Sequence, residues 1–203
     1  KKGFLPTMME ELYNERVTYK KKMLSAQQEF ENTKDNKYKK LISRYNNIQM
    51  ARKISLNSAY GAIGNQYFRY YDKAIAEGIT KSGQLSIRWI ENKLNKYLNN
   101  MLKTDEDYVV ASDTDSVYLT MDKLVSETIK SDNALSKTIN FLDKVASESI
   151  EPYITKSYEQ LKQYTNAYAN KMFMKREVIA DKGIWVAKKR YILNVWDSEG
   201  VSY

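Results

Sequence analysis

The sequence has no cysteine and no histidine among its 203 residues. Without cysteine the chain cannot form disulfides, thiolate zinc sites or a Cys nucleophile. Without histidine it cannot build a Ser-His-Asp triad, a His metal site or a His proton shuttle. Any acid–base or metal chemistry must therefore use carboxylates, Lys, Tyr or water. A site made of carboxylates favours hard cations such as Mg²⁺ or Mn²⁺.

Long apolar runs are also missing. None approaches the roughly 20 residues that a membrane span needs, and no signal peptide is visible, so we expect no membrane partner. The length allows one large domain or two small ones. The chain begins Lys1-Lys2-Gly3 rather than with Met, and we expect it to be a piece of a longer protein.

Positive charge dominates what is present. The chain carries 33 Lys and Arg against 25 Asp and Glu, which gives a net charge of +8. A basic balance of this size permits a polyanionic partner, with nucleic acid as the first candidate. The 17 tyrosines suit positions where a ring packs while its hydroxyl meets water or a ligand.

The N-terminal part predicts a long helical hairpin. One polar helix runs from Pro6 to about Lys34, and a second runs from Lys37 to about Tyr60 and ends at Gly61 and Gly64. We place four apolar side chains on the inner side of the second helix: Leu41, Tyr45, Ile48 and Leu56. Because this apolar seam is too thin for a core, we expect the hairpin to project from the main body.

The remainder predicts mixed structure. Apolar spacing of three or four indicates a helix over residues 73–102, and alternation predicts a β-hairpin over 107–121. Helical patterning returns from about Asn133 to Gln163, with an interruption near Pro152, and strands follow over 172–180 and 184–195. The fold class is therefore α+β, with a small antiparallel sheet backed by helices.

The stretch Asp113-Thr-Asp115-Ser116 places two carboxylates in the tight turn of the predicted β-hairpin. A divalent cation would neutralise the pair, and two such ions are the general device for nucleotidyl transfer. Asp, Thr and Ser are also ordinary turn formers, so the turn alone leaves both interpretations open. A calcium loop is excluded, because it would need an acidic or amide residue at Val117 and Gly at Tyr118.

Two polar patterns lie on the predicted hairpin helices. Lys53, Asn57 and Tyr60 share one helical face before Gly61, and a cation, an amide and a phenol suit a phosphate, a sugar and a base. A solvated face ending in a Gly cap is the alternative.

The second of these patterns is a basic pair. Arg16 and Lys20 are also i and i+4, and in an antiparallel hairpin they can approach Lys53. A solvated basic face remains the alternative for this pair.

The run Lys188-Lys189-Arg190-Tyr191 is expected on a late strand, where its cations could follow a phosphate backbone. An edge strand whose lysines prevent pairing with another chain explains the run equally well. Glu177 on the preceding strand is a candidate for a further carboxylate near the aspartates, and a surface Glu paired with Lys or Arg is the alternative.

The order of these signals resembles the family-B DNA polymerases, and most closely the replicative enzymes of tailed bacteriophages. Matching segments include K-x-x-x-N-S-x-Y-G at 53–61, DTDS at 113–116 and KKRY at 188–191. Segments at 68–72, 83–91 and 194–197 look like the same group, so the likeness spans most of the chain. The resemblance implies fingers over 1–60 and a partial palm of ferredoxin/RRM-like type over 61–203, with its first motif strand missing.

The resemblance also implies roles. Arg16, Lys20 and Lys53 would hold the triphosphate of an incoming nucleotide, and Asn57 would support the same site. Tyr60 would pack at the nascent base pair beneath the templating base, with Gly61 allowing close approach. Asp115 would coordinate the catalytic metals with Asp113 beside it, and residues 188–191 would grip the primer–template backbone.

The implied reaction is template-directed transfer of a nucleotide from dNTP to a primer 3′ hydroxyl by two-metal catalysis with Mg²⁺ or Mn²⁺. Primer–template DNA, dNTP, the remaining polymerase segments and a sliding clamp are the implied partners. The clamp would bind through parts outside this chain. The implied location is the cytoplasm, that of the bacterial host if the protein is phage-encoded. We expect the chain alone to be inactive.

Three departures from the family pattern are visible. No S-L-Y-P-like segment with its preceding aspartate occurs, so the chain holds only part of the metal site. Ala111-Ser112 stands where Tyr-Gly commonly precedes DTDS, and Lys175 stands where phage relatives often carry Asp. The Lys at position 175 weakens the assignment of Glu177 as a metal ligand.

Two other functions remain open from the sequence. One is a non-catalytic DNA-binding module on a degenerate polymerase palm, and the other is a palm-type nucleotidyl cyclase. Asp115 distinguishes the first from a polymerase, because Asp115→Asn in the full-length protein should abolish nucleotide incorporation only if the protein is a polymerase. Salt-dependent binding of primer–template DNA would argue against the second.

Overall fold

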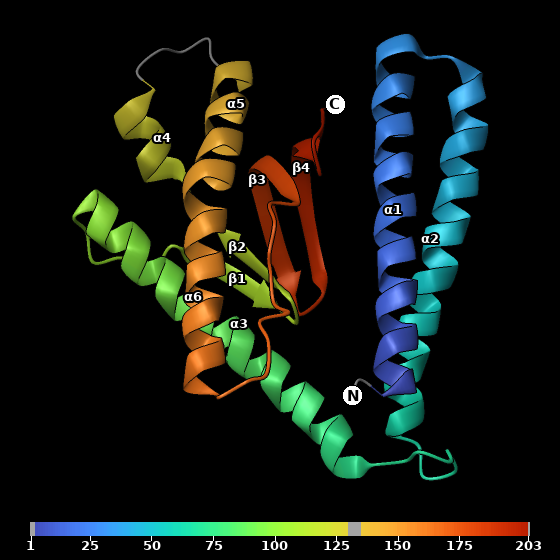
Figure 1. Cartoon of the computed structure of the whole chain (residues 1–203). Coiled ribbons are helices and arrows are strands. Elements are labelled where there is room, and N and C mark those ends of the chain that lie inside the picture. Colours follow the sequence, from blue (N-terminus) through green and yellow to red (C-terminus); the bar gives the residue numbers. More distant parts are fainter. Residues whose placement is uncertain (1–2, 130–134, 203) are drawn as a thin grey trace. The chain divides into compact units, whose positions relative to one another are not determined.

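The structure is a computed structural model that describes residues 3–129 and 135–202. Its elements follow the predicted order of helical hairpin, helix, β-hairpin, helix and strands, which confirms the α+β class (Figure 1). The elements are α1 (Phe4–Thr33), α2 (Asn36–Ile63), α3 (Lys73–Leu102), β1 (Val109–Asp113), β2 (Ser116–Leu119), α4 (Asp122–Thr128), α5 (Leu135–Val145), a π-helical segment (Ala146–Ile150), α6 (Glu151–Tyr164), β3 (Val178–Ala187), β4 (Arg190–Ser198) and β5 (Val201–Ser202).

The chain forms two compact units. The first comprises Lys1–Ile79 with Ser198–Tyr203, and the second comprises Thr80–Asp197. Across the described ranges, no helix combines the length and the apolar character that crossing a membrane requires.

The first unit contains the predicted helical hairpin, and its turn is fixed by caps. Lys34 adopts the left-handed conformation with φ 54°, and its N–H donates to the carbonyl oxygen of Phe30 at 2.7 Å. The Asp35 carboxylate then accepts from the Lys37 N–H at 2.9 Å and caps α2. The turn at residues 34–36 is therefore as the sequence predicts.

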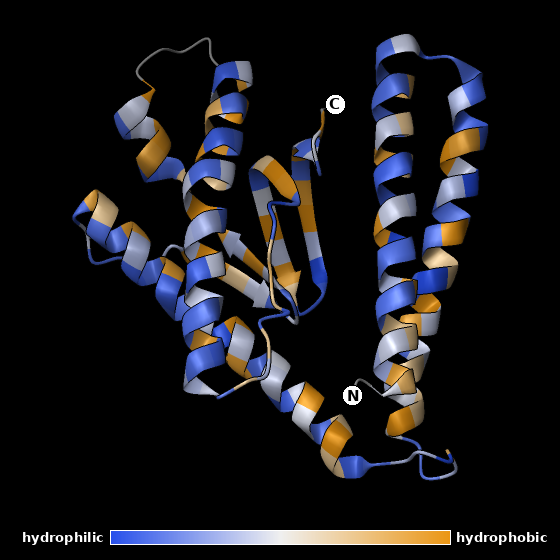
Figure 2. Cartoon of the chain, viewed as in Figure 1, coloured by the Kyte–Doolittle hydropathy of each residue, from blue (hydrophilic) through white to orange (hydrophobic). Residues whose placement is uncertain are grey.

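The seam between α1 and α2 is thin, as expected. In the described part of these two helices, the buried side chains are Ala26 and Gln49. Leu41 is 36% exposed, so its predicted inner position is wrong: it lies near the turn, where little of α1 remains to cover it. Tyr45, Ile48 and Leu56 are half-buried as expected. Figure 2 shows the hydrophilic residues that cover most of both helices.

Of the two glycines expected to end α2, Gly64 is confirmed and Gly61 is not. Gly61 lies inside the helix, and α2 ends at Gly64, whose N–H donates to the Tyr60 carbonyl oxygen at 3.2 Å. A short loop leads to Asp72, whose carboxylate accepts from the Ile75 N–H at 3.0 Å at the start of α3. The predicted bounds of this third helix are confirmed.

The core of the second unit lies between α3 and α6. Its buried side chains are Ile90, Leu94, Ile150, Ile154, Tyr158 and Leu161. Val117 and Leu119 of β2 pack against this cluster, so the helices back the β-hairpin as predicted. The Trp89 indole N–H donates to the Ser157 carbonyl oxygen at 2.9 Å, which ties α3 to α6.

Two asparagines of α3 fix the path of the chain into β1. The Asn95 side-chain oxygen accepts from the Tyr108 N–H at 2.9 Å, and the Asn99 oxygen accepts from the Glu106 N–H at 2.8 Å. The spacing of four places both amides on one helix face. The start of the β-hairpin is therefore positioned by hydrogen bonds as well as by packing.

The later helical segment is continuous rather than interrupted at Pro152. A π-helical segment over Ala146–Ile150 immediately precedes it, and Pro152 occupies the first turn of α6. Proline has no N–H to donate and its ring crowds the preceding turn, so a wider turn accommodates it without a break. The predicted start at Asn133 lies outside the described residues.

The C-terminal strands are shifted from their predicted bounds. Residues 172–177 are irregular, and β3 begins at Val178. β3 and β4 are neighbours in the second sheet and are joined at Lys188-Lys189, where Lys189 has φ 62°. The predicted strand through residues 188–191 is therefore wrong at its beginning, because Lys188 and Lys189 form the turn. The short helix α4 was not predicted.

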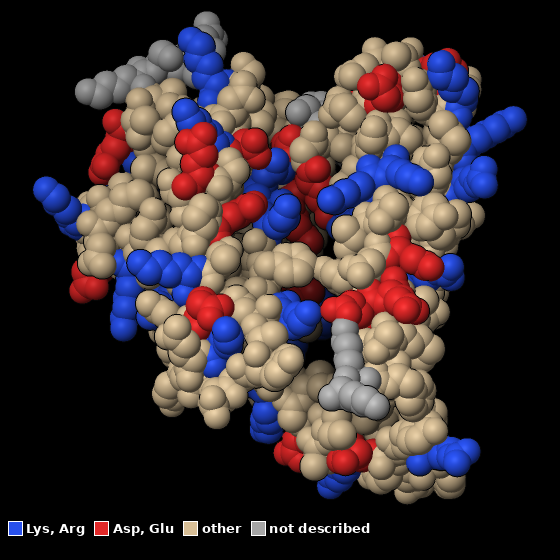
Figure 3. Space-filling model, viewed as in Figure 1, with Lys and Arg blue, Asp and Glu red and all other residues tan. Residues whose placement is uncertain are grey.

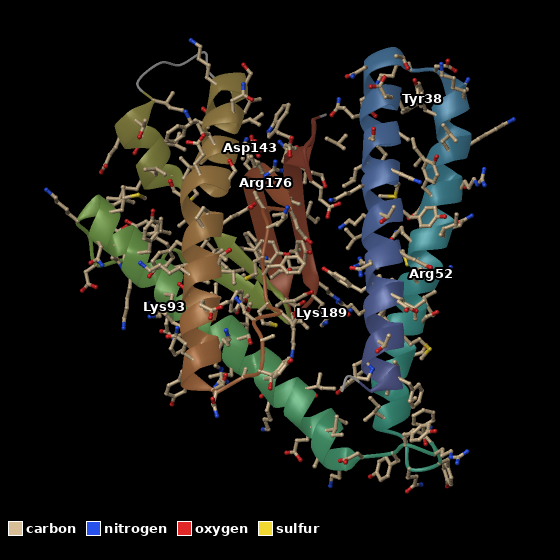
Figure 4. All side chains as sticks on the ribbon, viewed as in Figure 1. Tyr38, Arg52, Lys93, Asp143, Arg176 and Lys189 are labelled. Carbon is tan, nitrogen blue, oxygen red and sulfur yellow. The ribbon has the colours of Figure 1, made fainter. Side chains whose placement is uncertain are left out.

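Arg176 holds the irregular segment against the second unit. Its guanidinium forms ion pairs with Asp143 of α5 and Asp197 of β4, and Asp143 and Arg176 lie side by side in Figure 4. Its backbone N–H donates to a Glu151 carboxylate oxygen at 3.0 Å. The side chains of Arg176 and Asp197 are 15% and 8% exposed. Residues on both sides of Glu177 are thus anchored to helices and sheet.

Replacing Arg176 by Ala should remove its ion pairs with Asp143 and with the buried Asp197, and we expect a loss of about 3–5 kcal/mol in the free energy of unfolding. Urea unfolding of the chain measures this. Lys175→Ala, at an exposed neighbouring position, is the control and should change stability by less than about 0.5 kcal/mol. A loss of less than about 1 kcal/mol for Arg176→Ala would show that the ion pairs are not structural.

Candidate active site

The acidic turn closes the hairpin of β1 and β2. Asp113 pairs with Ser116 across the two strands, so Thr114 and Asp115 form the connection. Thr114 has φ 54°, which is unusual for a β-branched residue and costs free energy. Its hydroxyl donates to an Asp113 carboxylate oxygen at 3.0 Å, and the Asp115 N–H donates to the Asp113 carbonyl oxygen at 2.6 Å. The turn is therefore built differently from the Asn-Gly turns that two-residue connections prefer.

The two carboxylates are accessible to different degrees. Asp113 is half-buried and Asp115 is exposed. Within residues 3–129 and 135–202, no group of three or more carboxylates is arranged to hold a metal ion. Carboxylate oxygens are the donors that hard divalent cations prefer, so the pair fits such an ion as part of a larger ligand set.

The basic turn between β3 and β4 lies beside the acidic turn. Lys189 Nζ is 3.7 Å from an Asp113 carboxylate oxygen. Residues 188–191, which form this turn and the start of β4, are all exposed. Two patterns about 75 positions apart in the sequence are thus brought together within the second unit, and Figure 4 labels Lys189 at the turn.

An aromatic cluster joins the two hairpins. The Tyr118 ring of β2 meets the rings of Trp185 and Tyr191 edge-on, each with centroids 5.4 Å apart. Trp185 and Tyr191 stack on one another at 6.3 Å. Each aromatic pair contributes about 0.5–1.5 kcal/mol beyond area burial, whereas an exposed ion pair such as that of Lys189 contributes about 0–1 kcal/mol. The cluster therefore holds the hairpins together more strongly than the ion pair does.

Tyr118 and Trp185 were not singled out from the sequence. Burial raises the pKa of Tyr118 to about 12, with further contributions from the Tyr191 side chain and from the charges of Asp113 and Glu177. Glu177 is therefore near enough to Tyr118 to act on it electrostatically, and it is exposed. Strand alternation would have indicated Tyr118, because it faces away from the side of β2 that Val117 and Leu119 bury.

The predicted nucleotide-binding residues lie in the first unit. Lys53, Asn57, Tyr60 and Gly61 are all exposed on α2, and an added Cβ at Gly61 would meet no atom within 4 Å. The spacing puts the first three side chains on one face, as predicted. This face is open, so a ligand could reach all of them.

Arg16 and Lys53 lie at the same level of the hairpin. Arg52 Nε pairs with a Glu15 carboxylate oxygen at 2.5 Å, which joins the residues that precede them. Arg16 Nε is buried and, among the described atoms, has no hydrogen-bond partner. An unpaired buried donor is costly, and an anionic ligand would satisfy it.

Lys20 is engaged differently. Its ammonium forms an ion pair with Glu199, which belongs to the same unit. Figure 3 shows further Lys and Arg side chains toward the end of the hairpin where α1 and α2 join. Because its ammonium has three N–H donors, Lys20 could bind an anion beside the Glu199 carboxylate or in place of it.

Comparisons with known proteins identify the family of the chain. The model of the family described as DNA polymerase family B matches residues 1–161. The chain belongs to the family-B DNA polymerases. The resemblance expected from the sequence is thereby confirmed.

Individual relatives of this family-B chain come from phages, viruses and archaea. It is 36% identical to a DNA-directed DNA polymerase of Escherichia phage RB69, over 99% of this chain and 28% of the relative. It is 43% identical to a DNA-directed DNA polymerase of Enterobacteria phage T4, over 76% of this chain and 18% of the relative. A DNA polymerase of Pyrococcus glycovorans is 30% identical over 63% of the chain. The chain thus spans less than a third of the length of these phage relatives.

Alkaline pH should destabilise this family-B chain through two tyrosines. Burial raises the pKa of Tyr158, which is 3% exposed, to about 12, as it does for Tyr118. Between pH values of about 10 and 12 the unfolded chain loses these protons before the folded chain does, so the free energy of unfolding falls as pH rises.

Urea unfolding between pH 9 and 12 measures this slope, which should be shallower in the double variant Tyr118→Phe/Tyr158→Phe. Tyr67→Phe is the control, since Tyr67 is 88% exposed. Equal slopes in the wild type and the double variant would contradict the expectation.

Proposed function

We propose that this chain is the fingers and partial palm of a DNA-directed DNA polymerase. In the full-length protein it would support template-directed transfer of a nucleotide from dNTP to a primer 3′ hydroxyl. The observation that carries the proposal is the contact of the basic turn with the acidic turn, Lys189 to Asp113, in a chain of family B. A polymerase needs carboxylates for metals and cations for a DNA backbone in one place.

The reaction forms a bond between the primer 3′ oxygen and the α-phosphorus and breaks the bond to pyrophosphate. Asp115 would hold the catalytic Mg²⁺ or Mn²⁺ ions, with Asp113 beside it and Glu177 as a further candidate. These ions would lower the pKa of the primer hydroxyl and neutralise charge on the phosphates. The accessible oxygens of Asp115 are consistent with this role.

The first unit would supply the nucleotide site. Arg16, Lys20 and Lys53 would bind the triphosphate and steady the leaving pyrophosphate, because fixed cations stabilise charge that develops in the transition state. Asn57 would support the same site. Tyr60 would pack at the nascent base pair, and the open space at Gly61 leaves room for it.

The proposed domains are fingers over 1–60 and palm over 61–203. Primer–template DNA would be bound by residues 188–191, and the other polymerase segments and a sliding clamp would join through parts outside this chain. The phage relatives support a location in the cytoplasm of a bacterial host. Because the chain supplies only part of the metal site, the 203-residue chain alone would extend primers poorly or not at all.

Asp115→Asn in the full-length protein should abolish primer extension, since a neutral amide cannot balance the charge of a divalent cation. DNA binding should change little, because the DNA backbone contacts lie on the basic turn. Asp105→Asn, at an exposed loop position, is the matched control and should extend primers normally.

The measurements are single-turnover extension and a DNA-binding isotherm for each variant. Persistent extension by Asp115→Asn would remove this carboxylate from the chemistry. A wild-type protein that binds DNA but never extends a primer would instead favour the non-catalytic DNA-binding module.

Lys188→Ala should weaken binding of primer–template DNA evenly across sequences, because phosphate contacts carry no sequence information. The slope of log affinity against log salt should become shallower by about 1. Lys144→Ala is the control, because Lys144 lies on α5 and pairs loosely with Glu148 at 3.9 Å. An unchanged slope would show that Lys188 does not contact DNA, and salt-independent binding by the wild type would favour the nucleotidyl cyclase.

A further inference from the structure

One aromatic side chain touches both arms of the basic hairpin. Tyr118 of β2 contacts Trp185 near the end of β3 and Tyr191 near the start of β4, on the two sides of the turn that carries Lys189. We propose that Tyr118 is a positioning residue of the polymerase site, which sets the basic turn against the acidic turn. This inference rests on the proposed function and adds to it a residue with no assigned role.

The basic hairpin has little else to hold its outer end. Beyond Ala180, every residue of β3 is exposed, as are the first three residues of β4. The ion pair from Lys189 to Asp113 joins side chains that are 65% and 31% exposed. A hydrated pair of this kind does not fix a geometry. The ring contacts of Tyr118 therefore hold the turn more firmly than this ion pair does.

The cluster is built to receive Trp185. A Cβ added at Gly183 would lie 2.7 Å from the Trp185 ring and 2.7 Å from the Leu193 side chain. A side chain at this position would thus take the space that the indole ring occupies. Glycine at residue 183 lets Trp185 fold over the strand toward Tyr118, which indicates a packed arrangement rather than a chance approach of rings.

The phenol hydroxyl gives Tyr118 a second link to the turn. The Tyr191 side chain, two residues after Lys189, interacts with it, and burial keeps the phenol neutral by raising its pKa to about 12. Phenylalanine at position 118 would keep the ring contacts and remove the interaction of the hydroxyl with Tyr191, so the basic turn would move more freely relative to Asp113.

The consequence for the reaction follows from Lys189. The proposed function places its ammonium group at the primer backbone and beside a metal-binding carboxylate. A displacement of about 1 Å at a reacting centre can cost up to about a hundredfold in rate. Tyr118 would therefore affect the chemical step through Lys189, without touching the nucleotide or the DNA.

The test is a double-mutant cycle in the full-length protein, with Tyr118→Phe, Lys189→Ala and the two combined. Single-turnover incorporation is measured at saturating DNA over a range of dNTP concentrations. We expect Tyr118→Phe to lower the maximal rate about 10- to 100-fold. The dNTP affinity, the DNA affinity and the melting temperature should stay close to wild type, since the change is in positioning.

The cycle separates positioning from a merely structural role. In the Lys189→Ala background, Tyr118→Phe should have no further effect, because the group that it positions is gone. Tyr97→Phe is the control, since Tyr97 stacks on Tyr153 at 4.3 Å elsewhere in the second unit and should retain the wild-type rate.

Three outcomes would overturn the inference. The first is a wild-type rate for Tyr118→Phe, and the second is a double variant in which the rate losses of the two single variants multiply. The third is a lowered melting temperature of Tyr118→Phe that accounts for its loss of rate. Asp115→Asn distinguishes this failure from failure of the proposed function. If Asp115→Asn is inactive and Tyr118→Phe is normal, only the positioning role is wrong. If Asp115→Asn is active, the proposed chemistry at the acidic turn is wrong whatever Tyr118 does.

Discussion

The packing of β2 on the core between α3 and α6 is the constraint on which the candidate site depends. Val117 and Leu119 are held against that core, and they fix which face of the strand points inward. Because strand side chains alternate, Tyr118 must then point to the opposite face, where the basic hairpin meets it. Burial of two aliphatic side chains thus decides where the acidic turn lies and what stands beside it.

Charge and aromatic packing have separate tasks at this site. The charged groups of the two turns remain exposed or half-buried, so they keep the hydration that ligand exchange with a metal or phosphate requires. The rings of Tyr118, Trp185 and Tyr191 supply the cohesion that exposed charges cannot give. A site that must bind and release charged substrates is consistent with this division.

Family membership and local geometry support different residues. The family match covers residues 1–161, which include the helical hairpin and the acidic turn. The basic turn lies beyond the matched range, although the phage RB69 relative covers 99% of the chain. The proposed role of residues 188–191 therefore depends more on the contact with Asp113. The proposed role of Lys53, Asn57 and Tyr60 on α2 depends more on membership of the family.

Sequence patterns predicted the elements whose signal is local. The helix over residues 73–102 was predicted at its true bounds, because its apolar spacing of three or four continues over its whole length. The turn at 34–36 followed from local preferences in the same way. The π-helical segment was not predicted, because it depends on how neighbouring turns adjust to Pro152. Of the two glycines expected to end α2, Gly64 does so and Gly61 lies inside the helix.

The sequence by itself determined the kinds of chemistry open to the chain: carboxylates and cations, with neither thiol nor imidazole. It also placed two carboxylates in one turn and three polar groups on one helix face, because spacing along the chain fixes both. The tertiary structure alone decided that Lys189 stands beside Asp113 and that the Tyr118 ring packs between their hairpins. Those contacts join segments more than 65 positions apart, and only packing of the whole unit brings such distant residues together.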